Sequence, residues 1–289
     1  MRAKKQKRGR RDQRPENPKP IRLTERDLDI LQMLDACRLL STQHVQTLFF
    51  PSKHRAYARL QALYHHAFVD RLFLGVQTGL MNTAILYIID KRGVELLRAK
   101  RGLTIEWSAQ IKQVKPTFLE HALAINDVRV AVTKACENHS SQLGIWLGEN
   151  DLKSDYDYVQ IRNARGRMEG VSLIPDSYFN LALDTGTTHF FLEQDMGTMQ
   201  LSRFKQKVWA YLAYSQSGLS EKRFSTKKFR VLTVANSKQR ALNLKQATEE
   251  AGGQRRFWFT SREQVDVKTA LDAPIWWVAG DSKPTSLFT

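Results

Sequence analysis

Three linked segments decide the fold of the C-terminal half of the chain: Ser172-Leu-Ile-Pro-Asp176-Ser-Tyr-Phe-Asn-Leu, His189-Phe-Phe-Leu-Glu193-Gln-Asp195 and Lys205-Gln-Lys207-Val-Trp-Ala-Tyr211. The first two are short apolar runs bordered by acids, and the third is amphipathic and carries lysines. Short runs rich in aromatic and branched residues predict strands, whereas apolar residues three and four apart predict a helix. The stretch therefore predicts two neighbouring strands followed by a helix, with acids and lysines brought near one another.

The acids are expected to gather at the end of the second strand. Side chains alternate between the faces of a strand, so Phe191, Glu193 and Asp195 should share one face and Gln194 should lie on the other. Asp176 follows a proline that interrupts strand pairing, and it is expected on the neighbouring strand. Mg²⁺ binds one or two carboxylates together with water and phosphate. The sequence therefore predicts a Mg²⁺ site formed by Asp176, Glu193 and Asp195.

A lysine beside such acids would orient a nucleophile or offset developing charge. Lys207 is the first choice because it shares a helical face with Tyr211, four residues later. Lys205 is the second choice. Glu120, on a predicted helix over residues 117–135, borders an apolar face and is expected to turn toward the strand acids. The alternative left open is that the acids pair with Arg203, Lys205 or Lys207 and only hold the sheet to the helix.

The N-terminal part predicts three helices, a pair of strands and a fourth helix. The helices cover residues 24–35, 41–50 and 52–66, the strands begin at Val69 and Ala84 and are joined by a turn region from Gly75 to Gly79, and the fourth helix begins at Asp90. This order resembles a winged helix-turn-helix domain, whose third helix enters the major groove of DNA. The predicted DNA-binding residues are Lys53, Arg55, Tyr57 and Arg59 on that helix, with Arg71 and Gln77 on the wing. A protein-interaction domain with a solvated basic face is the alternative.

The charge of the chain favours a polyanionic partner. The 289 residues carry a formal net charge of +16, of which Met1–Pro20 contributes +7 and the remainder +9. Excess positive charge attracts nucleic acid over long distances and gains affinity by releasing counterions. Met1–Pro20 has almost no apolar residues and is predicted to be a disordered basic tail. Double-stranded DNA is the expected partner.

The remaining features set the domain organisation and the compartment. After the tail (1–20) we expect a winged helix-turn-helix domain (21–100), a linker (101–116) and an α/β domain with a mixed sheet (117–289). Within the last domain, residues 149–170 are predicted to be a charged, irregular excursion. The two cysteines are far apart in sequence and form no metal or disulfide pattern, and no apolar run could span a membrane. The sequence predicts a cytoplasmic protein with no membrane partner.

The acidic stretch resembles the PD-(D/E)XK nuclease superfamily. The Pro175-Asp176 pair matches the first acid of that motif, and Glu193-Gln194-Asp195 stands where its acid-x-lysine strand belongs. The resemblance implies a restriction-endonuclease-like fold, with Glu120 supplied by the preceding helix. The chain departs from the motif at Asp195, which occupies the position of the lysine. In some members of the superfamily the lysine lies on the next helix, where Lys207 stands.

The order of several motifs also resembles the replication-relaxation family of plasmids and mobile elements. These are Leu23-Thr-Glu-Arg-Asp-Leu-Asp-Ile-Leu, Leu40-Ser-Thr-Gln-His-Val, His121-Ala-Leu-Ala-Ile-Asn-Asp127, Phe191-Leu-Glu-Gln-Asp-Met-Gly-Thr-Met, Phe204-Lys-Gln-Lys-Val-Trp-Ala-Tyr211 and Phe229-Arg-Val-Leu-Thr-Val with Arg240. The resemblance covers roughly residues 21–280.

This resemblance implies a DNA-binding protein that acts in replication or mobilisation, as a Mg²⁺-dependent nicking enzyme if the acidic site is active. The rival hypothesis is a non-catalytic regulator with a degenerate nuclease fold, and a third is a protein-only adaptor. The oligomeric state is open, with a homodimer as one option, as is an association with replication or conjugation proteins.

Overall fold

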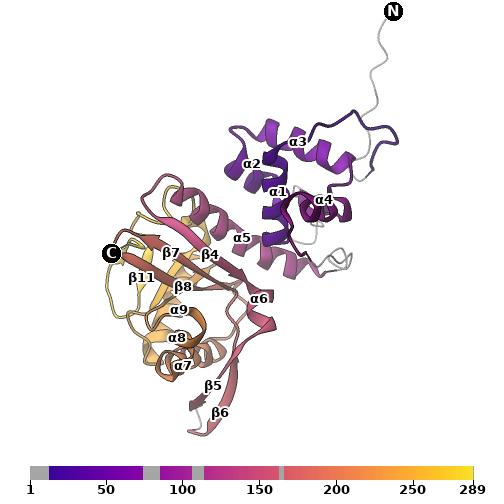
Figure 1. Ribbon diagram of the computed structural model, residues 1–289. Coiled ribbons are helices and arrows are strands. Elements are labelled where there is room, and N and C mark those ends of the chain that lie inside the picture. The colour runs from indigo at the N-terminus through magenta and orange to yellow at the C-terminus, as the bar shows by residue number, and fades with distance from the viewer. Residues whose placement is uncertain (1–12, 74–84, 106–113, 163–165, 289) are drawn as a thin grey trace, which may run out of the picture. The chain divides into compact units, whose positions relative to one another are not determined.

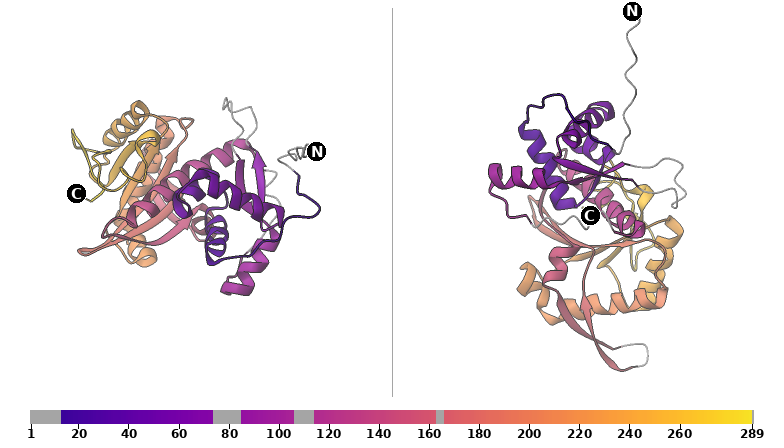
Figure 2. Two further views of the ribbon diagram at one scale, coloured as in Figure 1. Left: turned by 90° about the horizontal axis from the view of Figure 1, so that it is seen from above. Right: turned by 90° about the vertical axis from the view of Figure 1, so that its right-hand side faces the viewer.

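The fold is described from a computed structural model, which covers residues 13–73, 85–105, 114–162 and 166–288 (Figures 1 and 2). The chain divides into two compact units, Met1–Leu123 and Ala124–Thr289. The division falls within one long helix, α5 (Pro116–Cys136). None of the helices in the described ranges is both long enough and apolar enough to cross a membrane.

The first unit consists of helices around a small sheet. Its elements before α5 are α1 (Glu25–Cys37), β1 (Leu40–Ser41), α2 (Thr42–Phe49), α3 (Lys53–His65), β2 (Val69–Phe73), β3 (Ile85–Ile89) and α4 (Lys91–Arg101). The strands are antiparallel in the order β1-β3-β2. The predicted helices and both predicted strands are confirmed. The turn region predicted between Gly75 and Gly79, with Gln77, lies outside the described residues.

Capping side chains fix where the first three helices begin. The carboxylate of Asp27 accepts a hydrogen bond from the backbone N–H of Thr24 (2.7 Å) at the start of α1. The Ser41 hydroxyl accepts from the backbone N–H of His44 (3.1 Å) in α2, and the Ser52 hydroxyl caps α3 in the same way. Such contacts satisfy N–H groups that the helix itself leaves without partners. The start of α3 is therefore set by sequence immediately after Pro51.

The second unit is built on a seven-stranded mixed sheet. Its strand order is β12-β11-β10-β9-β8-β7-β4, in which β8, β9 and β10 are parallel and the other pairings are antiparallel. These strands are β4 (Gln142–Gly148), β7 (Ser177–Leu183), β8 (Gly186–Asp195), β9 (Arg230–Ala235), β10 (Phe257–Ser261), β11 (Trp276–Val278) and β12 (Pro284–Thr285). The helices after α5 are α6 (Glu149–Ser154), α7 (Leu201–Ser217), α8 (Leu219–Phe224) and α9 (Lys238–Glu250). The predicted mixed α/β arrangement is confirmed.

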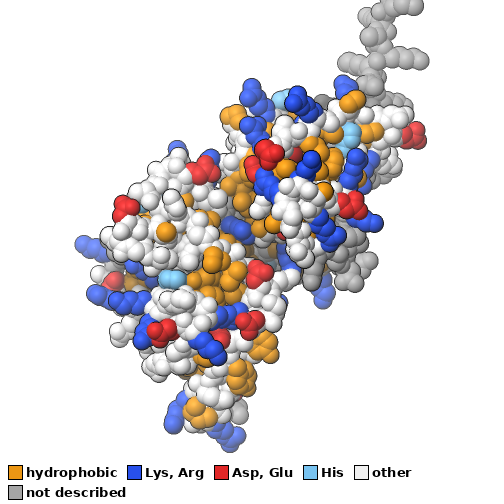
Figure 3. Space-filling model, viewed as in Figure 1, with side chains coloured by type: hydrophobic (Ala, Val, Ile, Leu, Met, Phe, Trp, Pro, Cys, Tyr) orange, Lys and Arg blue, Asp and Glu red, His pale blue; other side chains and the backbone are white. Residues whose placement is uncertain are grey.

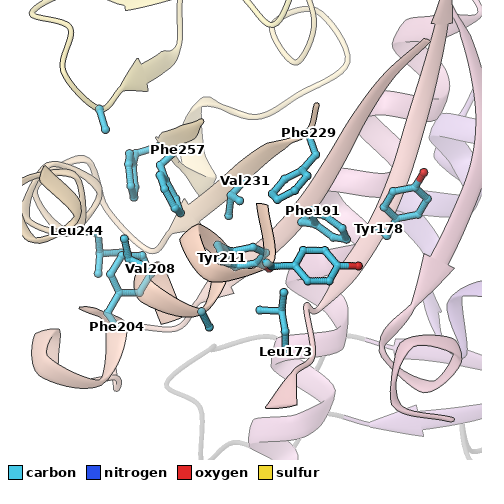
Figure 4. Packing of buried hydrophobic residues seen from close by; sticks show 14 of the residues in the cluster. Leu173, Tyr178, Phe191, Phe204, Val208, Tyr211, Phe229, Val231, Leu244 and Phe257 are labelled. Carbon is cyan, nitrogen blue, oxygen red and sulfur yellow. The ribbon is translucent and has the colours of Figure 1, made fainter. Parts of the chain in front are cut away.

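Apolar side chains cover both faces of this sheet. On one face Phe191 packs with Tyr211 of α7 and belongs to one cluster with Val208 of α7 and Leu244 of α9, as Figure 4 shows. On the other face Leu192 and its neighbours pack against the second half of α5. Adjacent residues of β8 thus belong to different cores, which confirms the predicted alternation. The consequence is that acids two residues apart on β8 lie on the α7 side of the sheet.

One segment of the second unit is better ordered than the sequence predicted. Residues 149–170 were expected to be irregular, and that expectation is wrong: they form α6, β5 (Asp157–Arg162) and the start of β6 (Met168–Leu173), an antiparallel hairpin. The apolar residues Val159 and Leu173 bury one face of this hairpin, a signal that the surrounding charges obscured. In the N-terminal segment, Arg14 donates hydrogen bonds to the carbonyl oxygens of Tyr64 (2.8 Å) and Val69 (3.1 Å).

Candidate functional site

The C-terminal end of β8 carries a buried carboxylate with two donors. Glu193 is only 5% exposed, and its side chain points toward α7. The Tyr211 hydroxyl donates a hydrogen bond to Oε1 (2.6 Å), and the Lys207 ammonium forms an ion pair with Oε2. Lys207 and Tyr211 are one helical turn apart, so they reach the same carboxylate together. Lys207 and Tyr211 thus share one face of α7, and the contact of Lys207 with Glu193 is the pairing that the sequence left open as a structural alternative.

Asp176 joins this cluster from the start of β7. Its backbone N–H donates to the carbonyl oxygen of Leu192 (3.1 Å), and its carboxylate Oδ2 accepts from the backbone N–H of Gln194 (2.7 Å). These two contacts straddle Glu193 and fix Asp176 against the end of β8. Asp176, Glu193 and Lys207 therefore form one cluster, as the sequence predicted.

Asp195 belongs to a separate ion pair. Arg240 on α9 donates from Nε to Oδ2 (2.8 Å) and from Nη2 to Oδ1 (3.1 Å), and the backbone N–H of Gly197 also donates to Oδ2 (3.1 Å). Arg240 in addition donates to the carbonyl oxygen of Met199 (2.5 Å). A bidentate arginine–carboxylate pair is both strong and geometrically specific. Asp195 therefore holds the β8–α7 connection to α9.

The other two predicted catalytic residues are placed differently. Lys205 forms an ion pair with Glu250 of α9 (2.7 Å), so the structure directs it to that helix and not to the acids of β7 and β8. Its neighbour two residues later, Lys207, takes the contact with Glu193. Glu120 lies on the part of α5 that belongs to the first unit, whereas Asp176 and Glu193 belong to the second.

Burial sets the protonation behaviour of the Glu193 cluster. Removal from water raises the pKa of Glu193, while the charge of Lys207 opposes that rise and the charge of Asp176 adds to it. Burial alone would lower the pKa of Lys207, but the charges of Glu193 and Asp176 outweigh it and the net shift is upward. Burial, reinforced by the negative charge of Glu193, raises the pKa of Tyr211 well above its usual value. The lysine and the tyrosine therefore both remain donors at neutral pH.

The arrangement fits a charge-balanced network better than a Mg²⁺ site. Mg²⁺ needs carboxylate oxygens that point into a common space left for water and phosphate. Both oxygens of Glu193 accept from Tyr211 or Lys207, and both oxygens of Asp195 accept from Arg240. Across the described ranges, no group of three or more His, Cys, Asp or Glu residues is placed to hold a metal ion. A metal at this position would have to displace those donors first.

In the first unit, the N-terminal turns of α3 present polar side chains to solvent. Lys53, His54 and Arg55 are exposed, and Tyr57 is half-buried on the same helix. The Ser52 cap and the buried Ala56 fix this end of the helix in place. Figure 3 shows Lys and Arg side chains over the elements of this unit. Lys53 and Arg55 are therefore accessible to a partner.

Two other predicted DNA-binding residues, Arg59 and Arg71, make contacts within the first unit. Arg59 donates from Nε to Oδ1 of Asp27 (2.6 Å) and from Nη2 to the carbonyl oxygen of Arg22 (2.8 Å). Arg71 is 8% exposed, and its guanidinium lies over the rings of Tyr64 (4.2 Å to the centroid) and Tyr87 (5.6 Å). Each arginine therefore supports the fold of the unit, and the predicted place of both on a DNA-binding surface stays a prediction.

The comparison with protein families found a match that includes residues of both units. The family model described as replication-relaxation matches residues 31–229, which is more than half of the chain. The chain belongs to the replication-relaxation family. No curated protein and no solved structure matches it. The family match begins within α1 and ends just before β9, and so includes α3, Asp176, Glu193 and Lys207 of this replication-relaxation protein.

The ion pair between Arg240 and Asp195 of this replication-relaxation protein was not predicted from the sequence. Arg240 lies three residues after the N-cap of α9 and was noted only as part of a motif. Its distance in sequence from Asp195 gave no signal for the contact. The contact between Arg240 and Asp195 follows from the parallel pairing of β8 with β9, because the helix after β9 begins beside the end of β8.

Proposed function

We propose that this replication-relaxation protein binds double-stranded DNA and acts, without cleaving it, in the replication of a plasmid or mobile element. The observation that carries the proposal is the exposed start of α3, with Lys53 and Arg55, within a unit ordered α1-β1-α2-α3-β2-β3. The three-stranded antiparallel sheet of this unit, of which β2 and β3 follow α3, supports a winged helix-turn-helix. In that class of domain, the N-terminal residues of the recognition helix reach the major groove.

The distribution of charge supports the same function. The first unit contains 23 Lys and Arg residues against 11 Asp and Glu residues, so it carries most of the net charge of the chain. Phosphate contacts made by such side chains supply affinity that does not depend on sequence. The side chains of Lys53 and Arg55 also have the length and donors to reach guanine edges.

The strand order of the second unit supports a nuclease-like fold. The ion pairs made by its acids favour a unit that binds no catalytic metal. The run β4-β7-β8 is antiparallel, and α7 then crosses to the parallel strand β9. This order resembles the core of restriction-endonuclease-like proteins, in which the acids lie on the second and third strands. Because Lys207, Tyr211 and Arg240 already hold the oxygens of Glu193 and Asp195, we assign the unit a role in clamping DNA or joining two copies of the chain.

Two measurements on the full chain test the proposal. Fluorescence anisotropy with a labelled duplex should show binding that weakens in Lys53→Gln and Arg55→Gln but not in the control Lys268→Gln, an exposed lysine of the second unit. Incubation with supercoiled plasmid in Mg²⁺ or Mn²⁺ should leave the plasmid intact. Binding that is unaffected by the α3 substitutions would refute the assignment of α3. Nicking that is lost in Asp176→Ala and Glu193→Ala would establish the rival nuclease.

A further inference from the structure

The hairpin β5–β6 carries an outward face that the proposed function does not use. Figure 1 shows it projecting from the second unit, with one face toward α7. Val159, Ile161 and Leu173 are buried on that inner face. The paired residues of the outer face are Tyr158 with Ser172, Gln160 with Gly170, and Arg162 with Met168. None of these six residues is acidic, and all but the half-buried Gly170 are exposed.

The hydroxyl end of the Tyr158 ring lies over Gly170. A Cβ atom at residue 170 would come within 2.0 Å of the Tyr158 hydroxyl oxygen and 2.4 Å of the ring atoms Cε1 and Cζ. The absence of a side chain at Gly170 is therefore what allows the ring to occupy this position, on the diagonal of the strand pair. The hydroxyl end of the ring lies against the glycine, and Tyr158 as a whole is still 58% exposed. Tyr158 thus keeps an exposed aromatic surface.

The base of the hairpin is fixed to two helices. The Tyr214 hydroxyl of α7 donates to Asp157 Oδ2 (2.6 Å), and Arg223 of α8 pairs with the same oxygen (3.2 Å). Asp157 directly precedes Tyr158, so these contacts hold the strand where the ring is attached. A group already held in its binding position loses less entropy when a ligand binds.

We propose that this face binds single-stranded DNA, with Tyr158 stacking on a base and Arg162 contacting a phosphate. An exposed aromatic ring with a cation farther along the same strand face is a combination that single-strand-binding surfaces use, since every base offers a π-face. In a duplex the bases are stacked on one another, so the ring favours an unpaired strand. Tyr158 and Arg162 are four residues apart, roughly 13 Å along a strand, which leaves room for intervening nucleotides. Figure 3 shows orange and blue side chains together at this end of the second unit.

This inference rests on the proposed DNA-binding function but uses a different surface, so the two can fail separately. The probe is a fluorescein-labelled oligothymidine, measured by anisotropy with the full chain at increasing salt. Tyr158→Ala should weaken binding about ten-fold, whereas Tyr158→Phe should stay within about two-fold, because the stacking face is kept. Arg162→Gln should reduce the slope of log affinity against log salt by about 0.7, the value for one phosphate contact on a single strand.

Gly170→Ala is the sharpest variant because it removes neither the ring nor a charge. The added methyl group displaces the ring, so oligothymidine binding should weaken as in Tyr158→Ala while circular dichroism and duplex binding stay unchanged. Unchanged oligothymidine affinity in both variants would overturn the inference, even if Arg55→Gln still loses duplex affinity. A change in mass by light scattering in Tyr158→Ala, with unchanged oligothymidine affinity, would instead assign the face to a second copy of the chain and also overturn it. Loss of duplex binding in Arg55→Gln with retained sensitivity at Tyr158 would support both sites.

Discussion

Arg59 of α3 holds Asp27 of α1, with the guanidinium Nε 2.6 Å from the carboxylate Oδ1. The Asp27 side chain is 1% exposed and that of Arg59 is 25% exposed. Asp27 also caps α1 through Thr24. One arginine of the predicted recognition helix therefore fastens that helix to α1, while Arg55, one turn earlier, remains exposed.

Arg59→Ala should lower the free energy of unfolding of the first unit by about 2–4 kcal/mol. The reason is that a buried carboxylate loses its charged partner, which costs more than the pair itself contributes. Urea denaturation of the full chain, followed by circular dichroism, measures the change. Arg55→Ala is the matched control, and because its side chain is exposed we expect a change within about 0.5 kcal/mol. Equal stability of the two variants would show that the pair does not support the unit.

The same pair predicts a dependence of stability on acid. Burial favours the neutral form of Asp27, but hydrogen bonds from Arg59 and Thr24 outweigh it and lower the pKa below the usual 3.8. A lowered pKa in the folded state gives stability that is complete above the usual value and is lost as pH falls through the folded value. The stability difference between the wild type and Asp27→Asn should be constant near neutral pH and shrink below about pH 4. A difference that is independent of pH down to pH 2 would contradict this assignment.

Local sequence patterns predicted most helices and strands, but they did not predict the side-chain contacts between residues far apart in the chain. The capping residue Thr24 and the alternation around Glu193 are readable because their physical cause lies within a few residues. Arg59 and Arg71 could not be separated from Arg55 in the same way, since charge type does not reveal whether a side chain is buried. The hairpin at Tyr158 was missed because charged residues on both sides of it obscured the alternation of Val159 and Ile161 with polar residues. Lys207 was preferred to Lys205 because helical spacing pairs it with Tyr211, and the structure places it beside Glu193, while its catalytic role stays a prediction.

Duplex binding should lose salt dependence when α3 is neutralised. If Arg55 contacts a phosphate, Arg55→Gln reduces the slope of log affinity against log salt by about 1. If Arg55 contacts a guanine edge, the slope is unchanged, and the loss of binding free energy, about 1–3 kcal/mol, is confined to one DNA sequence. Anisotropy titrations at several salt concentrations on two unrelated duplexes separate these cases. Lys268→Gln, far along the chain from α3, should change neither the slope nor the affinity.

The supercoiled-plasmid assay decides between a binding protein and a nuclease. We expect no nicked product in Mg²⁺ or Mn²⁺, because the donors that occupy Glu193 and Asp195 must leave before a metal can bind. Glu193→Gln and Asp176→Asn should accordingly leave duplex affinity as it is in the wild type. A nicked product from the wild type that disappears in both variants would show that the Lys207 contact opens during catalysis.

The Lys207–Glu193 pair should behave as a unit in a double-mutant cycle. Lys207→Met leaves the buried Glu193 carboxylate without its cation, at a cost of about 3–5 kcal/mol at neutral pH. Adding Glu193→Gln removes the stranded charge, so the double variant should recover much of the loss, and the two effects should not add.

The cost of Lys207→Met should also shrink as pH falls. Burial raises the pKa of Glu193, and a raised folded pKa gives stability that is present at low pH and lost as pH rises through that value. Urea denaturation of the four proteins between neutral pH and about pH 5 measures both effects; additive losses that do not vary with pH would show that the contact carries no net stability.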